Sequence, residues 1–240
     1  TAYEILTCDW SSDVCSSDRG DGKYYPQPKI DIRPRPEADE EDIRRHCHEA
    51  IRYGFCSVCV HPYRLPLAVA LVHGSPVQPA TVAGFPFGTN PTPVKVAEAR
   101  WAIDQGAREI DMVLNIGALK DGADRVALED IGAVVDVCHA GQVHCKVILE
   151  TCLLTDAEKE RACAIVADAG ADFVKTSTGL NSGGATVADI ELMSRAVKEK
   201  GLGVKAAGGI RSLADLEAMV RAGATRIGTS SGVAILAELG

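Results

Sequence analysis

Residues 171–179 (ADFVKTSTG) and 203–211 (GVKAAGGIR) share one pattern, in which a short apolar run ends on a lysine and small residues and glycines follow. The two lysines are Lys175 and Lys205. Short apolar runs are typical of buried strands in a parallel sheet, where neighbouring strands lie about 4.8 Å apart. If these two strands are neighbours, their ammonium groups share one pocket. The two segments therefore predict a parallel sheet with two lysines at the ends of adjacent strands.

Two buried lysines this close together would lower each other's pKa. Two cations about 6 Å apart, at an effective dielectric constant near 20, repel by about 3 kcal/mol, or about two pKa units. Burial also disfavours the charged form. A free lysine with a pKa of about 10.4 is almost wholly protonated at pH 7, whereas a depressed pKa leaves neutral amine that can attack a carbonyl carbon. The pair therefore predicts a Schiff-base nucleophile.

A repeating unit of helix and strand surrounds these segments from about residue 37 onward. A Ser, Thr or Asp followed three positions later by an acidic residue predicts a helix start, and a glycine predicts a helix end. The predicted starts are Asp39 with Asp42, Thr155 with Glu158, Thr186 with Asp189, and Ser212 with Asp215. The predicted ends are Gly54, Gly106, Gly170, Gly201 and Gly223.

The apolar segments between these helices are predicted strands. They are FCSVCV (55–60), QPATVAGFP (78–86), REIDMVLN (108–115), HCKVILE (144–150), ADFVKTS (171–177), LGVKAAGG (202–209) and TRIGTSS (225–231). An eighth, degenerate strand near Lys29–Arg33 would close them into an α/β fold of the (β/α)8, or TIM barrel, type. A doubly wound open sheet is the alternative, but the first strand-to-helix turn lacks G-x-G-x-x-G. Residues 29–240 are thus predicted to form a single barrel domain.

Residues 1–28 are predicted to be a disordered or non-native extension. The stretch from Thr1 to about Gly22 has no helix cap and no hydrophobic period, and it is rich in Ser, Asp and Gly. It also resembles translated sequencing-adapter read-through, and it is therefore left out of the fold prediction.

Composition excludes several classes of partner. The net charge of −8 argues against nucleic acid and against anionic membranes. No apolar stretch approaches the length of a membrane span and no signal peptide is visible, so we expect a soluble, cytoplasmic protein. Several of the nine cysteines, namely Cys56, Cys59, Cys145 and Cys163, lie in apolar strand or helix patterns. They are predicted to be small buried hydrophobic residues, and Cys56 and Cys59, which fall within a strand, are not expected to bind a metal.

Strand alternation predicts which side chains enter the barrel. Glu109 and Asp111 share one face of their strand, Lys146 and Glu150 share one face of the next, and the opposite faces are apolar. For Lys146 and Glu150 a buried ion network that fills the barrel is the favoured interpretation. Asp111 lies opposite the lysine pair, where it can act as a general acid–base group, as a counter-ion for a lysine, or as both.

Two glycine-rich loops predict a phosphate site. In barrel enzymes the loops after the seventh and eighth strands often hold phosphate. Here AAGGIR follows Lys205 and GTSSG ends the eighth segment. Glycine lets backbone N–H groups approach a phosphate, and hydroxyls and a guanidinium add hydrogen bonds and charge. The candidates are Gly208, Gly209, Arg211, Ser230 and Ser231.

In these residues the chain resembles the class I, Schiff-base aldolases of the 2-deoxyribose-5-phosphate aldolase family. The resemblance runs from about Pro36 to Leu239 through the blocks GFCSVCVHP, AGFPFG, EIDMVLNIGALKDG, KVILET, ADFVKTSTG, GGAT, VKAAGGIR and GTSSG. It implies a (β/α)8 lyase of deoxyribonucleotide catabolism that reversibly cleaves 2-deoxy-D-ribose 5-phosphate into D-glyceraldehyde 3-phosphate and acetaldehyde. It also implies a cytoplasmic homodimer that needs no metal and no organic cofactor.

The resemblance also implies residue roles. Lys175 would form the imine, Lys205 would lower its pKa, and Asp111 would relay protons. Cys59 matches a pocket cysteine that the chemistry does not require. The residues that match the substrate and phosphate loops are Thr178, Gly179, Gly208, Gly209, Arg211, Gly228, Ser230 and Ser231.

The first strand departs from the family pattern. Its usual form resembles IDHTLLKPEA, in which an Asp and a Thr reach the pocket, whereas this chain has IDIRPRPEADEED (30–42). Asp31 is kept, the Thr position is lost, and Pro34 and Pro36 remove ladder donors. Three hypotheses therefore stand: an aldolase, a phosphate-binding barrel that uses lysine and carboxylate without an imine, and a barrel that binds substrate without turnover.

Overall fold

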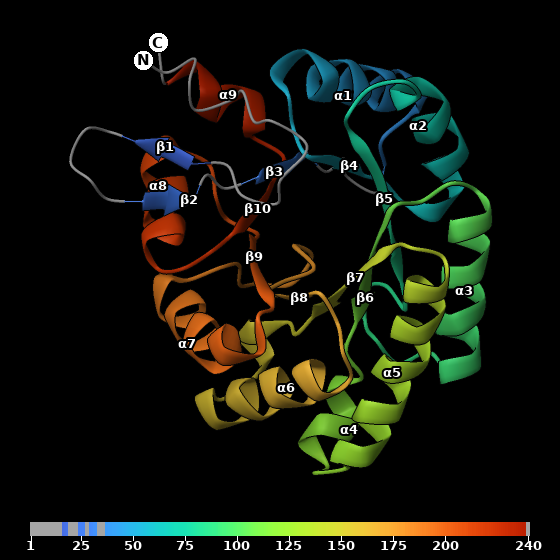
Figure 1. Cartoon of the computed structure of the whole chain (residues 1–240), viewed down its shortest axis with the longest axis vertical. Coiled ribbons are helices and arrows are strands. Elements are labelled where there is room, and N and C mark those ends of the chain that lie inside the picture. Colours follow the sequence, from blue (N-terminus) through green and yellow to red (C-terminus); the bar gives the residue numbers. More distant parts are fainter. Residues whose placement is uncertain (1–15, 19–23, 27–28, 33–36, 239–240) are drawn as a thin grey trace.

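Eight parallel strands form a closed barrel in the computed structural model, which describes residues 16–18, 24–26, 29–32 and 37–238. Each strand pairs with the next along the chain, and the last pairs with the first (Figure 1). The strands are β3 (Lys29–Ile32), β4 (Ser57–Cys59), β5 (Gln78–Ala83), β6 (Glu109–Val113), β7 (His144–Ile148), β8 (Phe173–Lys175), β9 (Gly203–Ala207) and β10 (Arg226–Thr229). The predicted (β/α)8 barrel is confirmed.

Helices surround the barrel in an outer layer (Figure 1). They are α1 (Glu40–Tyr53), α2 (Leu65–Val72), α3 (Thr92–Asp104), α4 (Ile116–Lys120), α5 (Asp124–Ala140), α6 (Asp156–Asp168), α7 (Val187–Val197), α8 (Leu213–Arg221) and α9 (Gly232–Ala237). Three short 3-10 helices lie at η2 (Pro62–Arg64), η3 (Thr151–Leu153) and η4 (Lys198–Lys200). The main hydrophobic core fills the space between strands and helices, and it contains the predicted outward residues Ile110, Met112, Leu114, Val147 and Leu149.

The predicted helix boundaries are confirmed at both ends. Reciprocal capping boxes begin α1 at Asp39, α6 at Thr155 and α8 at Ser212, while Thr186 accepts a hydrogen bond from the backbone N of Asp189 at the start of α7. Glycines in the left-handed region follow the helices because that conformation strains other residues. Gly54, Gly106, Gly170, Gly201 and Gly223 all have positive φ.

The chain before residue 29 contributes two described segments, β1 (Ser16–Asp18) and β2 (Tyr24–Pro26), which pair as a two-stranded antiparallel sheet. The remainder of the predicted extension lies outside the described residues, as do Arg33, Pro34 and Pro36. The predicted first barrel strand is confirmed over Lys29–Ile32, where β3 pairs with both β10 and β4.

Register across the barrel brings charged residues together. Asp111 of β6 lies opposite Lys146 of β7, and Lys175 of β8 lies opposite Lys205 of β9. Side chains at paired positions of neighbouring parallel strands point to the same face of the sheet. The register therefore collects these four side chains inside the barrel.

Among the described helices, none combines the length and apolarity that crossing a membrane requires.

Candidate active site

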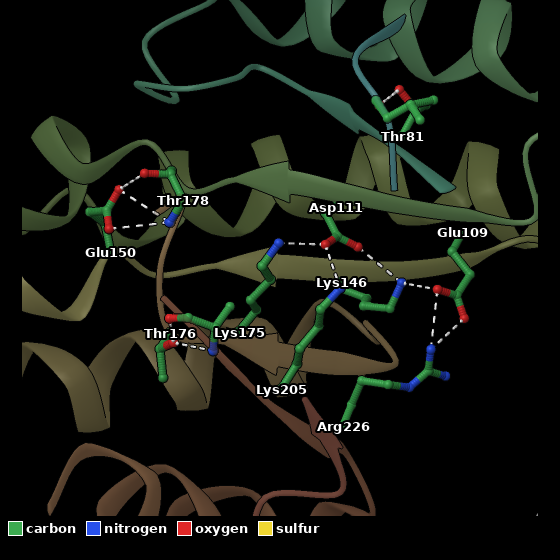
Figure 2. Close-up of polar contacts among 12 residues, drawn as sticks. Thr81, Glu109, Asp111, Lys146, Glu150, Lys175, Thr176, Thr178, Lys205 and Arg226 are labelled. Atoms are coloured by element: carbon green, nitrogen blue, oxygen red, sulfur yellow. Dashed lines mark hydrogen bonds and ion pairs between the residues drawn. The ribbon is translucent and has the colours of Figure 1, made fainter. Parts of the chain in front are cut away.

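Lys175 and Lys205 lie side by side in the barrel interior. Each is 1% exposed, and they are register partners on the adjacent strands β8 and β9, as the sequence predicts. Both Nζ atoms donate to the same oxygen of Asp111, at 2.6 Å from Lys175 and 3.0 Å from Lys205 (Figure 2). The two ammonium groups therefore lie together, as the two segments predict, and both contact the same carboxylate.

Asp111 is the centre of a buried charge network. Its second oxygen accepts a hydrogen bond from Lys146 Nζ at 2.9 Å, so three ammonium groups contact one carboxylate. Burial alone raises the pKa of Asp111, but the positive charges of Lys146, Lys175 and Lys205 outweigh it and hold that pKa well below its usual range. Asp111 is therefore ionised at neutral pH.

The network continues toward the opposite end of the barrel. Lys146 Nζ also donates to Glu109 at 2.7 Å, and Glu109 accepts from Arg226 Nη1 at 3.1 Å. The Phe173 ring lies against both cations, with its centroid 6.0 Å from Lys146 Nζ and 5.4 Å from the Arg226 guanidinium carbon. Lys175 and Lys205 are thus two like charges held close together in a buried site, and burial and mutual repulsion both favour the neutral form of one of them.

Glu150 corrects one prediction. The sequence assigns Glu150 to a network with Lys146, but Lys146 pairs with Glu109 and Asp111 instead. The alternation rule applies only within a strand, and β7 ends at Ile148. Glu150 has φ 57° and ψ 61°, a left-handed conformation that costs a non-glycine residue roughly 1–2 kcal/mol. Its side chain therefore leaves the barrel face and reaches the loop after β8.

Two glycines make room for the interior side chains. A Cβ atom at Gly228 would lie 3.1 Å from Lys205 Cε, so the missing side chain leaves space for this lysine. A Cβ atom at Gly203 would lie 2.2 Å from the Phe173 ring. The family resemblance assigns Gly228 to the substrate and phosphate loops, and the structure places Gly228 in β10, paired with Ala207 of β9.

The loops after β7, β8 and β9 pack directly on one another. Ala185 N donates to Gly208 O at 3.0 Å, and a Cβ atom at Gly184 would lie 2.4 Å from that oxygen. A Cβ atom at Gly183 would lie 2.5 Å from Cys152 Cβ. The GGAT block (183–186) therefore needs glycine because two neighbouring loops approach its backbone.

The turn glycines of these loops present backbone donors. Gly179, Gly208 and Gly209 have φ values of 81°, 88° and 81°. Within residues 37–238, no group accepts a hydrogen bond from the N–H groups of these three glycines. Consecutive free N–H groups in such turns form anion-binding concavities. The three glycines can therefore hold a phosphate at the carboxyl ends of β8 and β9.

The remaining predicted site residues lie at the same end of the barrel. Cys59 ends β4, is buried, and packs with Ala80, Val82 and Phe85. Arg211 and Ser230 are exposed, and Ser231 is half-buried, with its N donating to Thr229 Oγ1 at 2.9 Å. Arg211 N donates to Asp215 at 3.0 Å, which anchors the start of α8.

Sequence reasoning gave no correct partner for two buried charged groups close to the site. Lys95 of α3 donates to Asp130 of α5 at 2.5 Å and to Val113 O at 3.0 Å, at the end of β6. Glu150 accepts hydrogen bonds from Thr178 and Asn181. For Lys95, the only signal in the sequence is that a charged residue lies inside the helical pattern TPVKVAEA (92–99).

In the described part of the chain, no group of three or more His, Cys, Asp or Glu side chains is arranged to hold a metal ion.

Comparisons with known proteins show the family of this chain. Residues 28–238 match the model of the DeoC/LacD family aldolase. The chain is 54% identical over 204 residues to the deoxyribose-phosphate aldolase of Thermococcus gammatolerans, covering 84% of this chain and 90% of that protein. It is 52% identical over 202 residues to the enzyme of the same name from a Geobacillus species, with coverage of 84% and 90%.

A solved structure shows the same architecture. The deoxyribose phosphate aldolase from Aeropyrum pernix, described as tetrameric, superposes with a TM-score of 0.82 at 34% identity, over 88% of this chain and 89% of that one. The family model spans most of the chain, and the relatives far exceed the identity at which family membership is secure. The chain therefore belongs to the DeoC/LacD family of aldolases.

Proposed function

We propose that this chain cleaves 2-deoxy-D-ribose 5-phosphate reversibly into D-glyceraldehyde 3-phosphate and acetaldehyde through a Schiff base on Lys175. The aldolase activity follows from relatives that are more than half identical and carry the name deoxyribose-phosphate aldolase. The assignment of Lys175 has one main support, which is that two buried lysines on adjacent strands share a single carboxylate oxygen.

The first step requires a neutral amine. Lys175 Nζ attacks the aldehyde carbon C1 of the open-chain sugar, and loss of water leaves a protonated imine. Burial disfavours the charged form of Lys175, and the neighbouring Lys205, which donates to the same oxygen of Asp111, adds repulsion between like charges. Lys205 therefore acts as the electrostatic activator of Lys175 in this proposal.

The bond cleavage needs a proton acceptor and an electron sink. The protonated imine draws electrons from the C2–C3 bond as the hydroxyl proton on C3 is removed, which releases D-glyceraldehyde 3-phosphate and leaves an enamine on Lys175. Protonation of that enamine and hydrolysis by water release acetaldehyde and restore the amine. Asp111, ionised and 2.6 Å from Lys175 Nζ, is placed to pass these protons through water.

The phosphate binds, in our proposal, to the loops after β8, β9 and β10. The backbone N–H groups of Gly179, Gly208 and Gly209 are its main donors, because they have no acceptor among the described residues. Ser230 and Ser231 add hydroxyls, and the exposed Arg211 adds positive charge.

Reductive trapping tests the proposal. Borohydride added with acetaldehyde should attach an ethyl group to Lys175, and peptide mass mapping locates it. The peptide with Lys205 is the internal control, because it holds an equally buried amine. Label on another residue, or on none, would contradict the assignment. A barrel that uses lysine and carboxylate without an imine would turn over regardless of borohydride, and a barrel that only binds would be stabilised thermally by the sugar phosphate without cleaving it.

The same proposal covers the organisation of the chain. We take residues 29–240 as one barrel domain, since the closed ring of strands runs from Lys29 to Thr229, with residues 1–28 as an extension outside it. A cytoplasmic homodimer is expected from the family resemblance. Light scattering of the purified protein distinguishes a dimer from the tetramer described for the Aeropyrum pernix relative.

A further inference from the structure

We propose that Glu150 is a positioning residue, which holds the loop after β8 in the shape that binds the phosphate of the substrate. This inference rests on the proposed phosphate site and adds a residue to it. Glu150 lies two residues beyond the end of β7 and is 1% exposed. In the described part of the chain, it shares a positive φ outside glycine only with Gln142, so its backbone takes a conformation that L residues rarely adopt.

The carboxylate of Glu150 binds one short segment of the neighbouring loop. Thr178 N donates to Oε1 at 3.2 Å, and the Thr178 hydroxyl forms a short hydrogen bond to Oε2 (Figure 2). Asn181 Nδ2 donates to Oε2 at 3.0 Å. The strained backbone of Glu150 thus turns its side chain toward residues 178–181.

These hydrogen bonds define the turn that contains Gly179. The Thr178 hydroxyl accepts from Leu180 N at 3.2 Å while it donates to Glu150. Gly179 lies between Thr178 and Leu180 in the sequence and is exposed to solvent. Its backbone N–H has no acceptor among residues 37–238. Glu150 therefore sets the direction of the Gly179 donor without contacting the phosphate.

Charge explains why the contact has to be indirect. A free carboxylate beside a phosphate site would repel the substrate. Here the donors of Thr178 and Asn181 satisfy the Glu150 oxygens, and the N–H and O–H of Thr178 point to Glu150. Thr178, which the family resemblance assigns to substrate binding, thus acts as the link between Glu150 and the loop. Glu150 makes no ion pair with Lys146, Lys175 or Lys205 among the described contacts, so its loss should affect phosphate binding and not imine formation.

The test compares substrates with and without phosphate. For Glu150→Ala we expect KM for 2-deoxyribose 5-phosphate to rise about tenfold or more, while kcat/KM for unphosphorylated 2-deoxyribose changes less than about threefold. Borohydride trapping with acetaldehyde should still label Lys175. Glu150→Gln should restore most of the affinity, because its carbonyl oxygen accepts from Thr178 N and its amide donates to the Thr178 hydroxyl and to a rotated Asn181.

Controls separate positioning from general damage. Asp130→Asn breaks a buried ion pair with Lys95, on helices outside these loops, and it should lower stability without a selective loss for the phosphorylated sugar. If Glu150→Ala does not fold, Asn181→Ala should give a smaller rise of KM in the same direction. Equal losses for both sugars, or loss of trapping at Lys175, would overturn the positioning role.

The failure of this inference can be told apart from failure of the proposed function. Inorganic phosphate should raise the melting temperature of the wild-type protein in a thermal shift assay. The Glu150→Ala variant should need about ten times more phosphate for the same rise. This readout does not involve the Schiff base. Equal stabilisation of both proteins refutes the role of Glu150 even when Lys175 is trapped, whereas absent trapping in the wild type refutes the imine alone.

Discussion

Lys175 and Lys205 donate hydrogen bonds to the same oxygen of Asp111, from opposite positions on neighbouring strands. Because both bonds end on one oxygen, the two nitrogens lie within about 6 Å of each other, where like charges repel strongly in a buried site. The carboxylate holds the pair together and also accepts a hydrogen bond from Lys146. One amine can therefore lose its proton without leaving an unpaired buried charge.

Replacing Lys205 with leucine should shift the pH dependence of activity. Without the neighbouring cation, Lys175 keeps its proton to higher pH, and only the neutral amine attacks the carbonyl. We expect the activity optimum of Lys205→Leu to move up by about one to two pH units while the fold is retained. Initial rates across pH, with circular dichroism at each point, measure this. A pH profile that matches the wild type would refute the coupling.

Replacing Asp111 with asparagine should remove both the proton relay and the counter-charge of three lysines. We expect kcat to fall about 100-fold or more and the free energy of unfolding to fall by about 3–5 kcal/mol. Asp130→Asn is the matched control, because it also removes a buried carboxylate from a lysine. Rates normalised to the folded fraction separate the two effects. Comparable kcat values for the two variants would place Asp111 outside the reaction.

Asp172 directly precedes β8, at the other end of that strand from Lys175. We expect its carboxyl group to make the free energy of unfolding depend on pH. Burial raises its pKa, but hydrogen bonds from His144, the Cys145 backbone and His139 outweigh burial and lower the pKa of Asp172 to about 2. A depressed carboxyl pKa stabilises the fold above the unfolded pKa, and the gain is lost as pH falls toward the folded value. The expected contribution is about 2 kcal/mol at pH 5.

The imidazole of His144 acts in the opposite sense. Its hydrogen bond with Asp172 raises the pKa of His144 in the folded protein. The stabilisation of the fold by His144 is therefore fully present below the pKa of the unfolded state, and it is lost as pH rises through the pKa of the folded state. Urea unfolding from pH 2 to pH 8 should therefore show the largest deficit of Asp172→Asn between about pH 4 and pH 6. A deficit that is constant across this range would contradict the assignment.

Thiol reactivity should distinguish the described cysteines. Burial raises the pKa of Cys47 to about 11 and that of Cys163 to about 12, which leaves almost no thiolate at neutral pH. Cys152 is exposed on the loop after β7. Iodoacetamide should modify Cys152 first among the cysteines of residues 37–238, as peptide mass mapping would show. Early labelling of Cys163 in the native protein would contradict the burial.

Local sequence rules account for the elements and for part of the site. Capping boxes at Asp39, Thr155 and Ser212 and the glycine after each helix depend on residues within one turn, so they are readable from the chain alone. The placement of Lys175 and Lys205 in the interior follows from the period of two in a strand. Rules of this range cannot identify partners across the barrel.

The sequence by itself indicated that strands and helices alternate, favoured a closed eight-stranded barrel, and placed two lysines on adjacent strands. The prediction that both lysines end their strands holds for Lys175, whereas Lys205 lies in the middle of β9, which continues to Ala207. Only the tertiary structure decided which acid pairs with which base, because register and loop packing bring together residues that are far apart along the chain. Lys146 binds Glu109 and Asp111, while Glu150 turns away to Thr178. The physical reason is that alternation stops where β7 stops, and beyond that point the backbone conformation of one residue redirects the side chain.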